Sequence, residues 1–367
     1  MRPIALAAGG TAGHLFPALA AGRVLAGRGH RIVLLTDQRV AARAAAEAPG
    51  WELHVIASAA VAGRGAMAKA GAGLTLARGT VQVVRLLARL RPAAVVGFGG
   101  YPSVPPVLAA HLVSPRPAIL LHEQNAVLGG ANRFLAARAD RLALSHAATA
   151  RVPAGVASVV TGNPVRPEIA ALAGRPYTTP GDGFDLLVVG GSLGARVFAD
   201  VVPAALAMLA PAERARIRLV QQARAEDAAR VGEALAALGM AAEVAPFLTD
   251  MPARLARAHL VVARAGATTV AELAVAGRPA ILVPLPGAVD ADQALNAATL
   301  AEAGAAWPVA QPEFTPAALA ARLSEFLAQP QRLAAAAAAA ASLGRPAAAE
   351  TLADEVEAAI AAREAVR

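Results

Sequence analysis

Two glycine-rich segments of the chain have the composition of anion-binding turns. They are Gly9-Gly10-Thr11-Ala12-Gly13 and Gly190-Gly191-Ser192-Leu193-Gly194, and each follows a short apolar run and precedes a segment of helical composition. Glycine lets the backbone turn sharply and approach a ligand closely, and the helix that follows points unpaired amides at an anion, most often a phosphate. The repeated pattern predicts two similar domains, each with a ligand site.

Neither turn fits the common nucleotide-binding motifs. Both lack the Gly-Lys-Ser/Thr of a Walker loop, and neither has the Gly-x-Gly-x-x-Gly spacing of a dinucleotide site. Asp37 is the only acid after the first turn that is suitably placed to bind a ribose. The turns therefore disfavour both nucleotide triphosphate hydrolysis and nicotinamide chemistry.

Three further polar clusters lie where predicted strands end. They are Gly-Phe-Gly-Gly-Tyr-Pro-Ser at 97–103, His-Glu-Gln-Asn at 122–125, and Arg-Ala-Gly-Ala-Thr-Thr at 264–269 with Glu272 one helical turn later. In an open parallel sheet, the loops at the carboxyl ends of the strands form the ligand crevice. We therefore expect these polar side chains to converge on the sites of the two turns.

The elements that must position these residues alternate between strand and helix. Short apolar runs bounded by turn residues predict buried parallel strands at 3–8, 30–36, 93–98, 118–121 and 141–144, and again at 184–189, 216–221, 260–262 and 279–283. Segments at 18–26 and 38–48 and the Ala-rich tail at 315–327, 330–343 and 346–363 have helical composition. The fold class is therefore α/β, with parallel sheets covered on both faces.

Length and composition agree with this fold class. The chain has 367 residues, enough for about two domains at roughly 150 residues each. With 56% hydrophobic and 16% charged residues it is neither disordered nor fibrous. It has no cysteine, which excludes disulfides and thiolate chemistry.

No targeting or membrane-spanning segment is recognisable. The first apolar run meets Gly9 too early for a secretory signal. The longest stretch without a charged residue, 92–115, is broken by three glycines and by internal prolines, so it does not predict an unbroken transmembrane helix. We expect a cytoplasmic protein without a transmembrane segment.

Positive charge gathers in the first half of the chain. No Asp or Glu occurs from Leu53 to His122, whereas this stretch contains Lys69, Arg78, Arg85 and Arg89. Three interpretations compete: a nucleic-acid site, a solvated face without a partner, and attachment to anionic lipid. Aromatic content is only 3% and no nucleic-acid motif is present, so we expect no nucleic-acid partner. Segment 66–90 mixes apolar residues with spaced Arg, which favours a basic amphipathic segment at a lipid surface.

Taken together, the motifs resemble those of the MurG family of bacterial N-acetylglucosaminyltransferases. They occur in the family's order: 9–14, 99–101, 122–125, Asn163-Pro164-Val165-Arg166, 190–195, 264–269 with Glu272, and Asp292-Gln293 with Asn296-Ala297. The resemblance implies a GT-B glycosyltransferase with two Rossmann-like domains facing each other across a cleft. It implies an acceptor-binding, membrane-associating domain at 1–163, a UDP-sugar-binding domain at 164–345, and a last helix at 346–367 that packs back on the first domain.

The resemblance also implies the reaction. The family transfers N-acetylglucosamine from UDP-N-acetylglucosamine, with inversion, to the C4 hydroxyl of the N-acetylmuramyl group of lipid I. The product is lipid II for peptidoglycan synthesis. The expected partners are UDP-N-acetylglucosamine, lipid I, anionic inner-leaflet lipid and proteins of cell-wall synthesis and division. The expected location is the cytoplasmic face of the inner membrane, with peripheral attachment.

Site roles follow by resemblance, residue by residue. The donor side would comprise Thr11, Ala12, Gly13, Asn125, Arg166, Ser192, Ala267, Thr268, Thr269, Glu272 and Gln293. Ser192 would hold the diphosphate and Glu272 the ribose hydroxyls, although each also suits an ordinary position at a helix start. The acceptor side would comprise Gly13, His14, Tyr101, Glu123 and Asn125.

His14 and Glu123 are the candidates for chemistry. A helix N-terminus lowers the pKa of an imidazole, which would keep His14 neutral and able to accept the proton of the acceptor hydroxyl. The alternative for His14 is a capping residue that binds acceptor phosphate. Asp290-Ala291-Asp292 matches the Asp-x-Asp motif of metal-dependent sugar transferases. No other acid or histidine in the sequence is placed to complete the coordination of a divalent ion, so we expect neither a metal nor a cofactor.

Several positions depart from the family pattern, and other functions compete. Ala12, Asp292 and the segment Gln221-Gln222-Ala223-Arg224 differ from the residues common in the family. The competing enzymes are a GT-B transferase acting on diacylglycerol or another lipid, and a UDP-sugar epimerase. A catalytically inactive nucleotide-sugar sensor or membrane scaffold is the alternative from another class.

Overall fold

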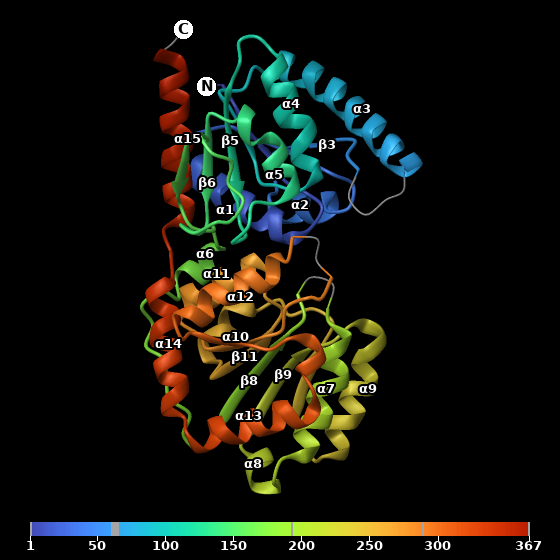
Figure 1. Cartoon of the computed structure of the whole chain (residues 1–367), viewed down its shortest axis with the longest axis vertical. Coiled ribbons are helices and arrows are strands. Elements are labelled where there is room, and N and C mark those ends of the chain that lie inside the picture. Colours follow the sequence, from blue (N-terminus) through green and yellow to red (C-terminus); the bar gives the residue numbers. More distant parts are fainter. Residues whose placement is uncertain (1, 60–65, 192–193, 288–289, 366–367) are drawn as a thin grey trace. The chain divides into compact units, whose positions relative to one another are not determined.

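The structure, a computed structural model, describes residues 2–59, 66–191, 194–287 and 290–365. It divides into two compact units, Met1–Arg166 with Ala347–Arg367, and Pro167–Pro346. Each unit is an α/β domain built on one parallel sheet (Figure 1). The predicted α/β fold class is confirmed.

The first unit contains a seven-stranded sheet in the order β3-β2-β1-β4-β5-β6-β7. Its strands are β1 (Ile4–Ala7), β2 (Ile32–Thr36), β3 (Glu52–Val55), β4 (Ala94–Gly97), β5 (Ala118–Glu123), β6 (Arg141–Leu144) and β7 (Ser158–Val160). Its helices are α1 (Ala12–Gly27), α2 (Ala41–Glu47), α3 (Ala66–Leu90), η1 (Tyr101–Ser103), α4 (Val104–Leu112), α5 (Gly130–Leu135), η2 (Ala136–Arg138) and α15 (Ala348–Ala365).

Successive residues of the central strands enter two different cores. Ile4 and Leu6 of β1 pack with α1 and α15, whereas Ala5 and Ala7 pack with α3, α4 and α5 on the other face. Both faces of β1 are therefore covered, which explains why its sequence is continuously apolar instead of alternating. Figure 1 shows α15 along one side of this sheet and α3 and α4 along the other.

The C-terminal helix α15 is an integral part of the first unit. Leu352, Ala353 and Val356 are fully or almost fully buried in the core that also contains Leu15 and Leu19 of α1. Ion pairs tie its polar side to the same unit, Arg28 to Asp354 at 2.8 Å and Arg141 to Glu355 at 2.9 Å, and a hydrogen bond joins His30 to Glu357 at 2.8 Å. The end of the chain thus completes a core that begins at residue 4.

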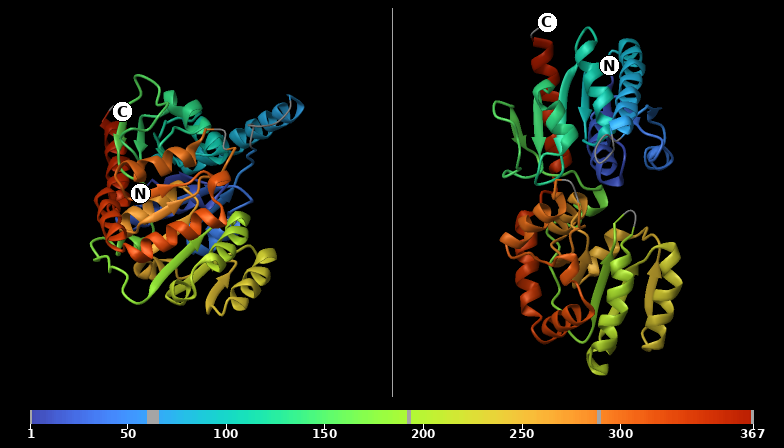
Figure 2. Two further views of the ribbon diagram at one scale, coloured as in Figure 1. Left: turned by 60° about the horizontal axis from the view of Figure 1, so that its bottom comes forward. Right: turned by 45° about the vertical axis from the view of Figure 1, so that its right-hand side comes forward.

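The second unit contains a six-stranded parallel sheet in the order β10-β9-β8-β11-β12-β13. Its strands are β8 (Phe184–Val189), β9 (Ile217–Gln222), β10 (Ala242–Ala245), β11 (Leu260–Ala263), β12 (Ala280–Leu282) and β13 (Ala306–Pro308). Its helices are α6 (Pro167–Ala170), α7 (Arg196–Met208), α8 (Pro211–Ala215), α9 (Ala225–Ala237), α10 (Met251–Arg257), α11 (Ala267–Ala276), α12 (Asp292–Glu302), η3 (Gln311–Glu313), α13 (Pro316–Ala328) and α14 (Gln331–Leu343). Figure 2 shows α7 and α9 beside β8 and β9.

Helix α4 was not predicted from the sequence. It lies inside the uncharged stretch 92–115 and carries Pro105 and Pro106 in its first turn. Proline is tolerated there because the amides of a first turn have no partner within the helix. None of the helices that the structure describes is long and apolar enough to cross a bilayer.

Truncating a core side chain of α15 tests its contribution to the first unit. We expect Leu352→Ala to lower the free energy of unfolding of that unit by about 2–5 kcal/mol, because it leaves a cavity in the core of α1 and the sheet. The measurement is urea unfolding followed by the fluorescence of Trp51, which packs against this core, in a Trp307→Phe background. Leu343→Ala is the matched control, because Leu343 is 40% exposed and lies in the second unit. Equal unfolding curves for the two variants would contradict the assignment of α15 to the core.

Candidate active site

The polar clusters occupy the topological switch point of each sheet. In the first unit the order in which successive strands join the sheet reverses between β1 and β4, and in the second it reverses between β8 and β11. Ligands of open parallel sheets bind outside the carboxyl ends of the strands at this point. Gly9 follows β1 and the 97–103 cluster follows β4, while Gly190 follows β8 and Arg264 follows β11. Each unit therefore has its own candidate site.

His14 lies in the first turn of α1 and packs against the two glycines after β4. A Cβ built on Gly100 would be 3.2 Å from Nε2 of His14, and one built on Gly99 would be 3.5 Å from Nδ1. Both glycines also have positive φ, +80° at Gly99 and +67° at Gly100. Both positions favour glycine because another residue would strain the backbone, and at Gly100 a Cβ would also crowd the imidazole.

The N-terminus of α1 retains its positive dipole. Thr11 is extended and exposed and makes no side-chain capping hydrogen bond, and the first turn contains no acidic residue. The amide of Gly10 donates to Oδ1 of the buried Asp37 at 3.2 Å, and Oδ2 of Asp37 accepts from Nε of Arg39 at 2.6 Å. Asp37 thus fixes the position of the turn. Thr11, Ala12 and Gly13 form the N-terminus of α1, which is suited to bind an anion.

A chain of hydrogen bonds runs inward from His14 through Gln124 and His122. His14 Nδ1 lies 3.0 Å from Oε1 of Gln124, and Nε2 of Gln124 lies 3.0 Å from the carbonyl of Phe98 and 2.9 Å from Nδ1 of His122. Nε2 of His122 lies 3.0 Å from the carbonyl oxygen of Gly162. Complete burial lowers the pKa of His122 to about 4, so this ring is neutral at pH 7.

The carboxylate of Glu123 is occupied within its own loop. Oε1 accepts from the backbone amide and from Nδ2 of Asn125, both at 3.0 Å. Oε2 accepts from the amide of Gly129 and from Nδ2 of Asn132, both at 2.9 Å. Glu123 is only 2% exposed. This geometry makes Glu123 the anchor of the loop that presents Asn125.

Two other predicted residues border the first unit's site. Tyr101 is half-buried and begins η1 directly after Gly100. Arg166 is the last residue of the first of the unit's two chain segments, and its guanidinium carbon lies 5.4 Å from the centre of the ring of Phe16 in α1. This places a cation beside the helix that carries His14.

Gln222 organises the glycine turn of the second unit. Its Oε1 accepts from the amide of Gly190 at 3.1 Å, and its Nε2 donates to the carbonyl of Gly191 at 3.1 Å. A Cβ on Gly190 would lie 2.4 Å from the backbone nitrogen of Ala195, so only glycine fits there. Ser192, the predicted diphosphate ligand, lies outside the described residues.

The remaining donor-side residues lie on α11 and α12. Ala267, Thr268 and Thr269 form the first turn of α11 after β11, and Glu272 follows one turn later with 8% of its surface exposed. Gln293 lies in the first turn of α12, and its Oε1 accepts from the amide of Leu285 at 2.9 Å. Among the residues with described positions, no three His, Asp or Glu are arranged to hold a metal ion.

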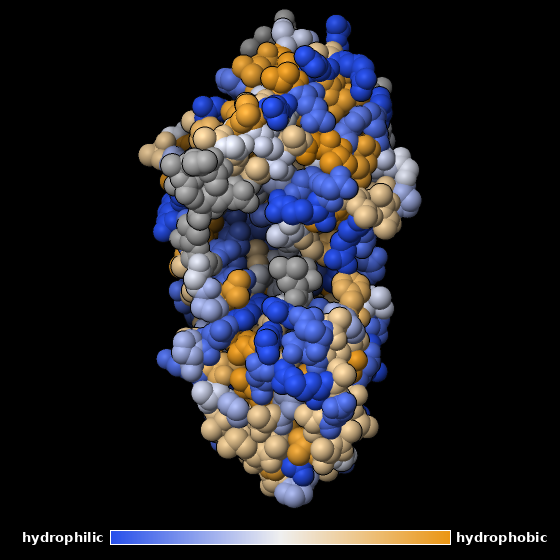
Figure 3. Space-filling view, turned by 90° about the vertical axis from the view of Figure 1, so that its right-hand side faces the viewer, coloured by the Kyte–Doolittle hydropathy of each residue, from blue (hydrophilic) through white to orange (hydrophobic). Residues whose placement is uncertain are grey.

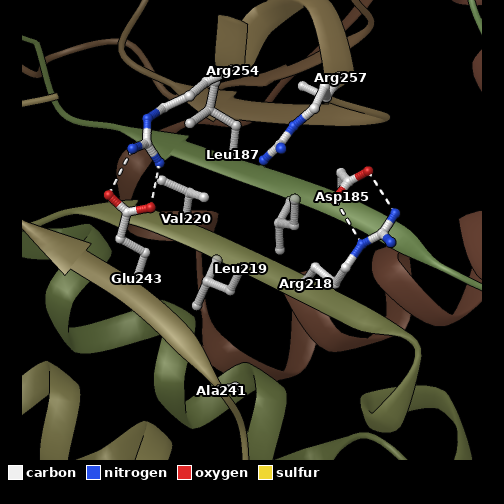
Figure 4. A pocket seen from close by; sticks show the side chains of 11 residues that line it. Asp185, Leu187, Arg218, Leu219, Val220, Ala241, Glu243, Arg254 and Arg257 are labelled. Atoms are coloured by element: carbon white, nitrogen blue, oxygen red, sulfur yellow. Dashed lines mark hydrogen bonds and ion pairs between the residues drawn. The ribbon is translucent and has the colours of Figure 1, made fainter. Parts of the chain in front are cut away.

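A cavity of about 450 Å³ lies elsewhere in the second unit and contains none of the predicted site residues (Figure 4). It opens over Leu187, Leu219 and Val220 and is bordered by the ion pairs of Arg218 with Asp185 and of Arg254 with Glu243. Asp185 and Arg218 lie near the amino ends of β8 and β9. The cavity is therefore distinct from the switch point.

The exposed face of α3 combines basic and apolar side chains. Arg78, Arg85 and Arg89 are exposed, and Leu74 and Val81, which share their helical face, are 56% and 52% exposed. The opposite face packs into the unit through Val83 and Leu87. Lys69 belongs to α3, but its side chain lies outside the described part of the chain. Figure 3, which looks onto the side where α3 lies, shows hydrophobic and hydrophilic residues next to each other.

Gln124, His122 and Gln222 are site residues to which the sequence assigned no role. The alternation of side chains in β5 is the signal that places His122 and Gln124 on one face of the strand and Glu123 on the other. For Gln222, the signal is its position at the end of β9, which pairs with β8. For Gln124 and Gln222, the side-chain amide at the end of a neighbouring strand holds the imidazole of His14 or the glycine turn.

The fold and its two switch-point sites define a GT-B glycosyltransferase. Two family models match the chain, the Glycosyltransferase family 28 N-terminal domain over residues 4–144 and the Glycosyltransferase family 28 C-terminal domain over residues 185–352. The chain belongs to glycosyltransferase family 28.

Known proteins resemble the chain over nearly its whole length. It is 54% identical over 358 residues to the "UDP-N-acetylglucosamine--N-acetylmuramyl-(pentapeptide) pyrophosphoryl-undecaprenol N-acetylglucosamine transferase" of Granulibacter bethesdensis, covering 97% of this chain and 93% of the relative. It is 55% identical to the protein of that name from Methylobacterium sp. strain 4-46, covering 98% and 97%. The crystal structure of Acinetobacter baumannii MurG has a TM-score of 0.78 and 30% identity and covers 97% of this chain and 99% of its own.

The depressed pKa of His122 predicts how stability depends on pH. The folded pKa of about 4 lies below the ordinary 6.5, so the contribution is fully present above pH 6.5 and is lost as the pH falls towards 4. A difference of this size corresponds to about 3 kcal/mol in the free energy of unfolding. Urea unfolding followed by Trp51 fluorescence at pH 7 and pH 4.5 measures it.

His122→Asn and His111→Asn form a matched pair for this measurement, because His111 is exposed at the end of α4. We expect the first variant to lose a large part of the pH dependence and the second to keep it. The same pH dependence in wild type and His122→Asn would show that the buried ring does not titrate as described.

Proposed function

We propose that the chain transfers N-acetylglucosamine from UDP-N-acetylglucosamine to the C4 hydroxyl of the N-acetylmuramyl group of lipid I, giving lipid II. The names of the relatives at about 50% identity support both substrates. The observation that carries the mechanism is the position of His14 at the first switch point, with its ring against Gly99 and Gly100 and its Nδ1 at Gln124. The product, lipid II, is a precursor for peptidoglycan synthesis.

The second unit is the donor domain of this proposal. Glu272 accepts hydrogen bonds from the ribose hydroxyls, and the backbone of Ala267 to Thr269 lines the nucleoside pocket. The turn after Gly190, with Ser192, binds the diphosphate through backbone amides. Gln293 reads sugar hydroxyls, since an amide both donates and accepts. Because the oxygen of Gln293 accepts the hydrogen bond from the amide of Leu285, its NH₂ group is the part of the side chain that donates to the sugar.

The first unit is the acceptor domain. Thr11, Ala12 and Gly13 meet phosphate or donor-sugar oxygens at the positive end of α1. Asn125, held by Glu123, and Tyr101 orient the acceptor sugar. Arg166 balances charge on the donor diphosphate. Glu123 acts through Asn125, because both of its oxygens are taken by donors of its own loop.

The reaction is a direct displacement with inversion. Nε2 of His14 takes the proton of the C4 hydroxyl while that oxygen forms a bond to the anomeric carbon. The bond from the anomeric carbon to the diphosphate oxygen breaks, and UDP leaves with the electron pair. Oriented amides and Arg166 stabilise the charge that develops on the diphosphate, an effect worth several kcal/mol in comparable sites.

The direct test of the proposed reaction uses both substrates. Labelled UDP-N-acetylglucosamine incubated with a lipid I analogue should give UDP and a disaccharide linked to the lipid. Diacylglycerol as the only acceptor should give no glycosylated lipid. Transfer to diacylglycerol, or epimerisation of the donor without transfer, would replace the proposal by one of the competing functions.

Removing the base separates chemistry from binding. We expect His14→Ala to lower kcat by about 10²-fold or more, the usual contribution of a general base, and to change the Kd for UDP-N-acetylglucosamine by less than about 2-fold. Turnover assays and calorimetric titration measure the two quantities. His111→Ala, a replacement of an exposed histidine in the same unit, should change neither. Unchanged kcat in His14→Ala would remove His14 as the base.

We further propose that the exposed face of α3 binds anionic lipid and places the enzyme at the cytoplasmic face of the inner membrane. Lipid I is a polyprenyl pyrophosphate and stays in the bilayer, so the acceptor domain must work at its surface. Arg78, Arg85 and Arg89 supply attraction to anionic headgroups, and Leu74 and Val81 supply apolar contact. Proteins of cell-wall synthesis and division are proposed neighbours at the same surface.

Neutralising this face tests the lipid contact. Each basic residue near an anionic surface contributes about 1 kcal/mol, so Arg78→Gln, Arg85→Gln and Arg89→Gln together should weaken binding to phosphatidylglycerol vesicles on the order of 100-fold. The affinity for UDP should stay unchanged. The control replaces the exposed Arg175, Arg257 and Arg345 of the second unit by Gln, with the same change in net charge. Equal loss in both triple variants would show that only net charge matters.

A further inference from the structure

The hydrogen bonds around Gln124 determine which of its two side-chain atoms faces His14. One atom of its amide lies within hydrogen-bond distance of two acceptors, the carbonyl of Phe98 at 3.0 Å and the carbonyl of His122 at 3.2 Å. Only the NH₂ group can donate to carbonyls, so this atom is Nε2. The other atom, Oε1, therefore faces Nδ1 of His14 at 3.0 Å and can only accept a hydrogen bond from it.

The same reasoning fixes the proton of His122. Its Nε2 lies 3.0 Å from the carbonyl oxygen of Gly162, which can only accept, so Nε2 carries the proton. Its Nδ1 then has a free lone pair, which accepts from Nε2 of Gln124 at 2.9 Å. The two requirements on Gln124 agree: its NH₂ group must face inward, and its oxygen must face His14.

We propose that Gln124 is a positioning residue that holds His14 in the tautomer with the proton on Nδ1, so that the lone pair of Nε2 is the base. The inference rests on the proposed role of His14 in the transfer. All hydrogen bonds of the chain are donated in the same direction. Nδ1 of His14 donates to Gln124, Gln124 donates to His122, and His122 donates to the carbonyl of Gly162. Reversing Gln124 or His122 would set a buried donor against a donor, and reversing His14 would set the lone pair of its Nδ1 against the oxygen of Gln124.

Burial keeps this order stable. Gln124 is 1% exposed and His122 is fully buried, and burial is what depresses the pKa of His122 to about 4. A neutral His122 retains the lone pair that Gln124 needs, whereas a protonated ring would present a second donor to the NH₂ group of Gln124. Gly100 contributes at the other end, since its missing Cβ would lie 3.2 Å from Nε2 of His14 and would cover it.

The tautomer can be observed without any assay of activity. Long-range ¹H–¹⁵N spectra of the full-length protein distinguish a protonated Nδ1 from a protonated Nε2 in each of the seven histidines. Loss of signals in His14→Gln and in His122→Gln assigns the two rings. We expect Nδ1–H for His14 and Nε2–H for His122 in the wild-type protein. A wild-type His14 with its proton on Nε2 would overturn the proposal.

Two substitutions of Gln124 distinguish its role as hydrogen-bond acceptor for His14 from a role in packing alone. Gln124→Met keeps the size of the side chain but accepts nothing from His14, so His14 should become a mixture of tautomers and kcat should fall about 10-fold or more, with the Kd for UDP-N-acetylglucosamine unchanged. A neutral Glu at this position has one oxygen that accepts from Nδ1–H and a protonated oxygen that donates to the carbonyl of Phe98, so Gln124→Glu should restore the wild-type tautomer of His14 and raise kcat above that of Gln124→Met. Gln82→Met, which removes a glutamine that bridges the backbone at Val55 and Ala57, should change neither.

The outcomes distinguish this proposal from the proposed function. An Nδ1–H tautomer of His14 that persists in Gln124→Met contradicts the role of Gln124, whatever the activity. A second outcome is that Gln124→Met loses the Nδ1–H tautomer without any fall in kcat and that His14→Ala is fully active. This outcome supports the positioning role of Gln124 and removes His14 as the base. Loss of kcat with an unaltered tautomer assigns Gln124 a packing role and also contradicts the proposal.

Discussion

The carboxyl ends of parallel strands meet at one edge of a sheet, and the sites of this protein depend on that constraint. In the first unit, the end of β1 carries the turn into α1 and His14, the end of β4 carries Gly99 and Gly100, and the end of β5 carries Gln124. The space around the imidazole and its hydrogen-bond partner thus come from segments that lie 85 to 110 positions after His14 in the sequence. The same edge of the second sheet gathers Gly190, Gln222 and α11.

Burial of polar side chains at these edges is costly unless every donor finds an acceptor. The loop after β5 meets this requirement in two separate ways. Glu123 turns to one side of the strand and accepts from four donors of its own loop, whereas His122 and Gln124 turn to the other side and lead to His14. One short motif therefore builds both a rigid loop and an oriented ring, and its residues divide between these tasks by the alternation of a β-strand.

The sequence predicted the fold class and the places of the turns, because both depend on local signals. The strand expected at 184–189 coincides with β8, and the glycine turns follow β1 and β8 as expected. Helix α4 escaped prediction because its prolines look like breakers unless they are known to lie in the first turn. The return of α15 to the first unit follows from a core that spans both ends of the chain, which no local pattern reveals.

The residues of the candidate site also fall into those that local sequence signals reveal and those that only the fold reveals. Glycine, histidine and acidic residues could be selected from the sequence because their types are chemically distinctive. The partner of each could not, since the hydrogen bond from His14 to Gln124 spans 110 positions and the one from Gly190 to Gln222 spans 32. The occupied carboxylate of Glu123 likewise depends on a loop conformation that the motif alone does not specify.

A crystal structure with UDP-N-acetylglucosamine and a lipid I analogue bound together would test most directly how the strand ends position the two substrates. We expect the uracil nucleotide at α11 and the turn after Gly190. We expect Nε2 of His14 within about 2.6–3.2 Å of the acceptor C4 hydroxyl, with Nδ1 of His14 still at Gln124. Nucleotide bound away from both of those segments, or an acceptor hydroxyl out of reach of His14 and close to another base, would contradict it.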